Sequence, residues 1–144
     1  MIKLSATVPS PKGDGTVAES LITPTRIYVK SCLAAMRASD SVRSFAHITG
    51  GGLTENIPRV LSDNLAARID VTAWKRPAVF DWIAKEGGVD EAEMRRAFNC
   101  GIGMVVIVAP DAEATVRAAL ESEGETVSRI GEVIARDSDP VVYS

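Results

Sequence analysis

Apolar and polar residues follow two different periods along this chain, one typical of helices and one of strands. Residues 27–38 place Val29, Leu33 and Met36 at helical spacing, which predicts an amphipathic helix whose apolar side chains pack in the core. In contrast, residues 101–109 form a nearly continuous apolar run that is rich in β-branched side chains, GIGMVVIVA. Such a run is typical of a strand buried on both faces. The chain therefore predicts both kinds of element.

Proline and glycine indicate where several of the other elements begin and end. Pro77 predicts the start of a helix that Gly87 and Gly88 close, and Pro110 starts another that ends at Gly124. Pro58 limits helical structure in the segment TENIPRVL. The pattern further predicts a short edge strand at residues 2–8, a helix at 90–98, and strands at 44–48, 65–70, 126–134 (bent near Gly131) and 141–143.

Interleaved strands and helices indicate a sheet that is covered by helices. Two predicted helices separate the strand near residue 69 from the one near residue 102, so the order is not a regular βαβ repeat. We therefore expect the α/β (α+β) class, with a mixed sheet flanked by helices on both faces. Residues 1–16, which contain the Pro- and Gly-rich run PSPKGDGT, predict a strand and a linker, and residues 17–144 one domain.

Composition excludes several classes of function. The 144 residues are 46% hydrophobic and 24% charged, as in an ordinary globular domain. The net charge of −3 and the scattered basic residues argue against a nucleic-acid partner. No apolar run is long enough for a membrane span, so we expect a cytoplasmic protein. One histidine and two distant cysteines, Cys32 and Cys100, lack the spacing of a zinc site, so we predict no metal site and interpret both cysteines as buried thiols.

The segment AHITGGGLTEN, residues 46–56, has the clearest chemistry. A predicted strand leads into three glycines and then into a helical turn. Residues without a Cβ allow close approach of the backbone to a ligand, and free N–H groups before a helix favour an anion such as phosphate. The candidate substrate-phosphate residues are Thr49, Gly50, Gly51, Gly52 and Asn56. The alternative is a tight turn that needs glycine for its shape alone.

His47, just before these glycines, is the candidate catalytic residue, because a histidine beside a phosphate can donate a hydrogen bond or move a proton. The alternative is a buried histidine with satisfied hydrogen bonds. A second glycine cluster, FNCGIGM at residues 98–104, makes Asn99 and Gly101 candidates for lining the same cleft. The alternative there is a strand whose glycines permit close packing.

Four segments occur together in one known family: LITPTRIYVKS, AHITGGGLTENIPRVL, WKRPAVFDWI and EMRRAFNCGIGM. In this order and wording they resemble aminoimidazole ribonucleotide synthetases, also called phosphoribosylformylglycinamidine cyclo-ligases. The resemblance runs from about Leu21 to Val142. It implies an enzyme that uses ATP to close the imidazole ring of formylglycinamidine ribonucleotide in purine biosynthesis. In that reaction the formyl oxygen is phosphorylated, the amidine nitrogen attacks, and phosphate leaves.

The resemblance also implies a division of work between two domains. The amino-terminal domain of the family binds ATP and Mg and makes most of the homodimer contact. The carboxy-terminal domain, with a partly ferredoxin-like topology, closes the cleft over the ribonucleotide. This chain resembles only the carboxy-terminal domain, so residues 1–16 are interpreted as the junction with a missing ATP-binding domain. We expect its partners to be the ribonucleotide and its own amino-terminal domain, and the chain alone to be inactive.

Three alternatives remain open at this point. The chain is a domain of another enzyme in the same ATP-using superfamily, such as the preceding amidotransferase of the pathway or a small-molecule kinase. Alternatively, it is a non-catalytic phosphate-binding module. As a third possibility, it is a structural fragment that exposes apolar surface normally covered by the missing half.

Overall fold

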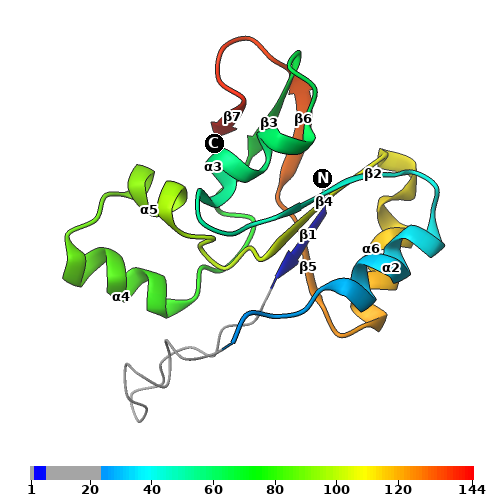
Figure 1. Cartoon of the computed structure of the whole chain (residues 1–144), viewed down its shortest axis with the longest axis horizontal. Coiled ribbons are helices and arrows are strands. Elements are labelled where there is room, and N and C mark those ends of the chain that lie inside the picture. The colour runs from blue at the N-terminus through cyan, green and yellow to red at the C-terminus, as the bar shows by residue number, and fades with distance from the viewer. Residues whose placement is uncertain (1, 6–23) are drawn as a thin grey trace.

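The computed structural model describes residues 2–5 and 24–144, in which a four-stranded antiparallel sheet forms the centre (Figure 1). Its strand order is β2-β4-β1-β5. The strands are β1 (Ile2–Ser5), β2 (Val42–His47), β4 (Met104–Val108) and β5 (Thr126–Arg129). Helix α2 (Val29–Ala38) follows β1, and α6 (Glu113–Ser122) follows β4. This order and the antiparallel pairings are those of a ferredoxin-like βαββαβ unit.

A second, smaller sheet stands beside the first. Its central strand β3 (Leu65–Ile69) pairs antiparallel with β6 (Gly131–Ala135) and parallel with β7 (Val141–Tyr143). The α/β class is confirmed, but the mixed pairing belongs to this three-stranded sheet and not to one continuous sheet. The predicted bend at Gly131 is where the chain passes from β5 to β6, and a Cβ at Gly131 would collide with the carbonyl oxygen of Arg68.

The remaining elements connect the strands at positions that the sequence predicts. They are α3 (Gly52–Asn56), η1 (Pro58–Val60), α4 (Ala78–Gly87), α5 (Glu91–Ala97) and η2 (Pro110–Ala112). Pro58 separates α3 from η1, and Gly88 closes α4 in the left-handed region at φ 60°. At the start of α5, the side chain of Asp90 accepts a hydrogen bond from the Glu93 amide at 2.8 Å.

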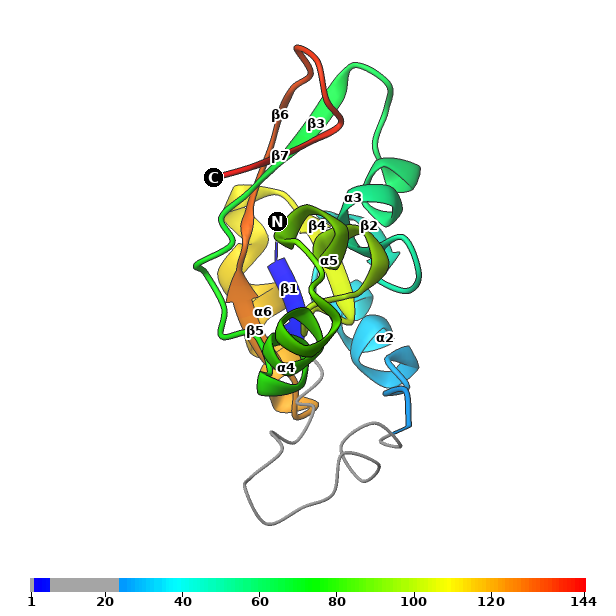
Figure 2. The same ribbon diagram turned by 90° about the vertical axis from the view of Figure 1, so that its left-hand side faces the viewer.

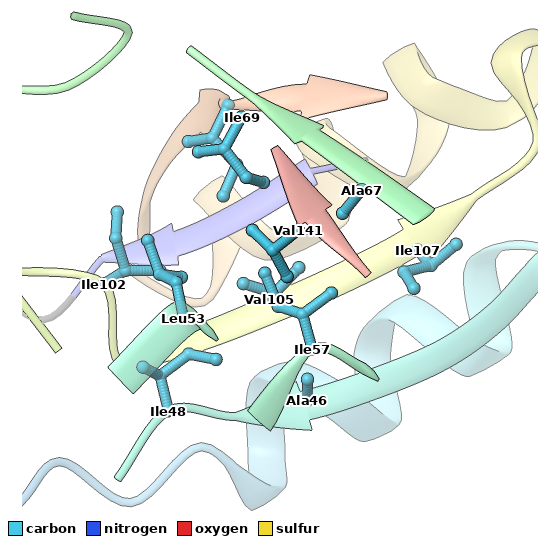
Figure 3. Packing of buried hydrophobic residues seen from close by; sticks show 11 residues of the cluster. Ala46, Ile48, Leu53, Ile57, Ala67, Ile69, Ile102, Val105, Ile107 and Val141 are labelled. Carbon is cyan, nitrogen blue, oxygen red and sulfur yellow. The ribbon is translucent and has the colours of Figure 1, made fainter. Parts of the chain in front are cut away.

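Strand β4 supplies both faces of the core, as its apolar run predicts. All five of its residues are buried. Met104, Val106 and Val108 pack beneath α2 and α6, while Val105 and Ile107 pack on the opposite face with α3 and the small sheet. Figure 3 shows this second cluster, in which Leu53 and Ile57 lie next to Val105. Helices therefore lie on both faces of the larger sheet (Figure 2).

One expectation about the amino-terminal segment of the chain is wrong. The first strand is not an edge strand, because β1 lies between β4 and β5 in the sheet. The Pro- and Gly-rich run and the rest of residues 6–23 lie outside the described residues.

The apolar side chains of α2 do not pack in the core. Val29, Leu33 and Met36 are 64%, 42% and 54% exposed, and Ile27 just before the helix is 82% exposed. The helix instead buries its small residues Ser31 and Ala35, which allow close approach to the sheet and α6. Helical spacing predicted the stripe of apolar residues but not the direction in which it points.

Within residues 2–5 and 24–144, none of the helices combines the length and the hydropathy that crossing a lipid bilayer requires.

Candidate functional site

The glycine turn, residues 49–52, connects the end of β2 to the start of α3. Thr49 and Gly50 are exposed, Gly51 is half-buried, and Gly52 is buried. The Gly52 amide donates to the Thr49 carbonyl at 3.0 Å, and the Glu55 amide donates to the Gly51 carbonyl at 3.0 Å. Gly51 adopts a left-handed conformation at φ 97°, which glycine tolerates best. The turn therefore lies at the surface on one side and in the core on the other.

The side chain of Asn56 determines which way the peptide groups of this turn point. Its Nδ2 atom donates to the carbonyls of Gly52, Gly50 and Thr49 at 2.8, 3.2 and 3.4 Å. In a trans peptide the carbonyl and the next N–H point in opposite directions. The N–H groups of Gly50 and Gly51 are therefore directed away from Asn56. Neither donates a hydrogen bond to any residue that the structure describes.

These contacts divide the predicted phosphate residues into two groups. Thr49, Gly50 and Gly51 present unused polar groups near the surface, as an anion site requires. Gly52 and Asn56 are committed to the turn itself: the Gly52 amide is already bonded, and the Asn56 side chain is buried and satisfied. Binding of phosphate by any of these residues stays a prediction.

Gly52 also allows α5 to approach closely. A Cβ at this position would collide with the carbonyl oxygen of Arg95 and would lie 2.7 Å from that of Phe98. The interpretation that the turn needs glycine for its shape therefore applies to Gly52. It does not apply to Gly50, where a Cβ would meet nothing within 4 Å.

His47 is exposed, so the alternative of a buried, satisfied histidine is wrong. Alternation along β2 directs Ala46 and Ile48 into the cluster beneath α3, and Phe45 and His47 to the side of α2. There the imidazole contacts the ring of Tyr28, with ring centroids 5.9 Å apart and an interplanar angle of 68°. A catalytic role for His47 stays a prediction.

Tyr28, which precedes α2, is the residue at this site that sequence reasoning missed. Its side chain is buried, and a Cβ at Gly103 would collide with its hydroxyl oxygen. Burial, with the nearby negative charge of Glu125 as a smaller cause, raises the pKa of Tyr28 to about 12. The phenol therefore stays protonated well above neutral pH. The sequence feature that could have indicated Tyr28 is its place within the segment TPTRIYVK.

The second glycine cluster lies beside the turn, and its lining of a shared cleft stays a prediction. The Ile48 amide donates to the Gly103 carbonyl at 2.9 Å, and the Phe98 carbonyl faces Gly52. Asn99 is half-buried, and its Oδ1 atom accepts from the Gly101 amide at 2.9 Å. Gly101 is buried, at φ 93°, where a Cβ would collide with Pro77. The packing alternative thus applies to Gly101, and contact of Asn99 with a ligand stays a prediction.

A ferredoxin-like α/β unit with a second small sheet and an exposed glycine turn is the class of domain that these observations define. The chain matches the family described as AIR synthase related protein, C-terminal domain, over residues 1–144, and it belongs to that family.

Solved structures with this fold share only a small part of their sequence with this chain. HypE from E. coli is 21% identical over 82% of this chain and 36% of that chain, with a TM-score of 0.62. HypE in a HypE–HypF complex is 17% identical over 99% and 48%, with a TM-score of 0.66. Thiamine-monophosphate kinase from Stenotrophomonas maltophilia K279a is 14% identical over 72% and 32%, with a TM-score of 0.52. The chain thus spans less than half the length of each of these proteins.

Proposed function

We propose that this chain is the carboxy-terminal domain of a phosphoribosylformylglycinamidine cyclo-ligase and that its glycine turn binds the phosphate of the ribonucleotide substrate. Family membership over the whole chain supports the domain assignment. The four sequence segments that resemble the cyclo-ligases support the particular reaction. A cyclo-ligase of this kind would act in the cytoplasm, where it would work on a small molecule and not on nucleic acid or membrane.

One observation carries the phosphate assignment: Asn56 binds three carbonyls on the inner side of the turn. The amides of Gly50 and Gly51 are thereby directed together toward the opposite side, and neither donates a hydrogen bond within the described residues. Successive amides that point the same way form a concave site for an anion. Nearby, Arg59 donates to Asn56 Oδ1 at 3.2 Å, which adds positive charge beside the turn.

In this proposal, ATP and Mg bind to a preceding domain of the same enzyme. The enzyme would be a homodimer in which each subunit contains that domain as well as this one. Within the described residues, no group of three or more His, Cys, Asp or Glu side chains could hold a metal ion. The exposed apolar face of α2, formed by Ile27, Val29, Leu33 and Met36, supports a second domain or subunit that covers it. The same exposed face is also expected if the chain is a structural fragment that lacks such a partner.

Substitution of Gly50 tests the phosphate site without changing the fold, because a Cβ there would meet nothing within 4 Å. A carboxylate about 5 Å from a phosphate charge costs about 3 kcal/mol at an effective dielectric constant of about 20. Solvent at this exposed position reduces that to about 1 kcal/mol, or about fivefold in Kd. We expect Gly50→Asp to weaken binding of ribose 5-phosphate to this chain by at least that factor, and Gly50→Ala to leave it unchanged.

The measurement is an NMR titration of the chain that follows the Gly50 or Gly51 amide signals. Equal affinity of the Asp and Ala variants would remove the phosphate role of the turn. The reaction itself is tested by adding an ATP-binding domain of a cyclo-ligase and analysing the product. Formation of aminoimidazole ribonucleotide supports the proposal, whereas a phosphorylated product, or binding without turnover, would favour a kinase or a binding module.

A further inference from the structure

Three segments that are far apart in the sequence meet at the end of β2. They contribute Tyr28 from TPTRIYVK, His47 from AHITGGG, and Gly103 from GIGM. The Tyr28 ring packs against the His47 ring with centroids 5.9 Å apart, and its hydroxyl lies against Gly103 where any larger residue would collide. The Gly103 carbonyl accepts from the Ile48 amide, between His47 and the glycine turn. The Tyr28 ring is thus placed directly beside the strand end from which the turn departs.

A buried carboxylate fixes the backbone on both sides of Tyr28. Glu125, 6% exposed, accepts a hydrogen bond from the Ser31 hydroxyl at 2.6 Å and forms an ion pair with Arg26 Nε at 2.9 Å. Arg26 also donates through Nη2 to the Gly124 carbonyl at 3.0 Å. Arg26 precedes Tyr28 and Ser31 follows it, so both flanks of the tyrosine are tied to the residues that lead into β5. These contacts restrain the segment that carries the Tyr28 ring.

An exposed side chain ordinarily exchanges among rotamers, and a ligand that binds it must stop this exchange. His47 is exposed, and its imidazole contacts the ring of Tyr28. A fixed ring on one side restricts the imidazole before a ligand arrives. The entropy cost of ordering the imidazole is then part of folding and does not weaken ligand binding.

We propose that Tyr28 is a positioning residue that holds the His47 imidazole beside the glycine turn, oriented toward an anion bound by the Gly50 and Gly51 amides. The part concerning the anion rests on the proposed function. The positioning acts through the ring, so the hydroxyl is not required for it. Gly103 serves the same arrangement, because it provides the space into which the phenol fits.

The test uses the fact that His47 is the only histidine of the chain, so its imidazole signals are assigned without ambiguity. In the ligand-free chain, NMR measures the nuclear Overhauser effect between the Tyr28 and His47 rings and the χ1 couplings of His47. We expect a strong effect and a single χ1 rotamer. Tyr28→Phe keeps the ring and should preserve both results, whereas Tyr28→Met fills similar apolar volume without a ring and should give averaged couplings.

Phosphate binding supplies the second readout, with inorganic phosphate and ribose 5-phosphate as probes at neutral pH. In Tyr28→Met we expect the shift of the His47 signal on saturation to decrease and affinity to fall by about twofold to tenfold, as expected for one side chain that the ligand must now order. Tyr28→Phe should match the wild type. Phe80→Met, which removes a buried ring from the separate cluster around α4, is the control for a general loss of packing.

The outcomes separate this inference from the phosphate site. An averaged His47 χ1 in the wild type, or an unchanged His47 in a folded Tyr28→Met, would overturn the positioning role whatever the ligand does. If His47 is ordered by Tyr28 but phosphate moves neither His47 nor the Gly50 and Gly51 amides, the positioning stands and the phosphate site fails. If Tyr28→Met does not fold, the wild-type couplings and the Tyr28→Phe comparison still decide.

Discussion

Gly50 and Gly52 lie two residues apart in the same turn, yet the structure gives them opposite requirements. The backbone of Gly50 is outside the left-handed region, and a Cβ there would meet nothing within 4 Å. Gly52 has φ 55°, and its Cβ would lie 2.7 Å from the Phe98 carbonyl oxygen and 2.8 Å from the Arg95 carbonyl carbon. We therefore predict that Gly52→Ala destabilises the domain and that Gly50→Ala does not.

The magnitude follows from two separate costs at Gly52. Both neighbours are backbone atoms at the end of α5, so the strain cannot be relieved by turning a side chain. Overpacking of this kind costs about 1–3 kcal/mol, and the left-handed backbone adds about 1–2 kcal/mol for alanine. The sum of about 2–5 kcal/mol is a large part of the roughly 5–15 kcal/mol that stabilise a typical domain. At Gly50 we expect a change within about 0.5 kcal/mol.

Thermal and urea unfolding of the two variants measure this difference. For a domain of this size, about 3 °C of Tm corresponds to 1 kcal/mol, so Gly52→Ala should lower Tm by about 6–15 °C. Equal midpoints for the two alanine variants would refute the assignment of Gly52 to packing. The phosphate titration gives a second readout. A folded Gly52→Ala variant should lose phosphate affinity only in proportion to the displacement of the glycine turn.

Three further predictions concern the same region. Asn56→Asp replaces a buried donor by a carboxylate that repels the carbonyls it faces, which should cost about 2–4 kcal/mol in urea unfolding. Because burial raises the pKa of Tyr28 to about 12 from 10.0, the folded state keeps a proton that the unfolded chain loses. The contribution of Tyr28 to the free energy of unfolding is therefore complete below about pH 10 and should fall by about 3 kcal/mol between pH 10 and pH 12. Tyr28→Phe should remove this fall. Leu33→Lys, at an exposed position, should change the free energy of unfolding by less than about 0.5 kcal/mol but weaken binding of a partner domain.

Most helices and strands could be predicted from the sequence because their boundaries are local properties. Pro77 and Gly88 delimit α4 through a fixed φ and a left-handed cap, and neither effect needs a distant residue. Pro58 separates α3 from η1 for the same kind of reason. The buried run of β4 was equally clear, because a short apolar run rich in β-branched residues is typical of a strand with both faces covered.

Long-range pairing could not be predicted in this way. The place of β1 between β4 and β5 depends on partners 100 to 127 residues away in the sequence, and the second sheet pairs β3 with strands more than 60 residues downstream. The apolar row of α2 shows the same limit. Its spacing specifies that one face is apolar, but Ser31 and Ala35 pack inward because of the sheet and α6, which come later in the chain.

The candidate site shows where local reasoning ends. Sequence alone indicated an anion-binding turn, because three glycines between a strand and a helix leave amides free. The different roles of those glycines depend on α5, whose carbonyls occupy the space beside Gly52 from more than 40 positions downstream. The direction of the free amides depends on Asn56, which the sequence placed among the ligand contacts. In the structure its side chain also orients the turn, so its substitution should affect folding and binding together, whereas Gly50→Asp should affect binding alone.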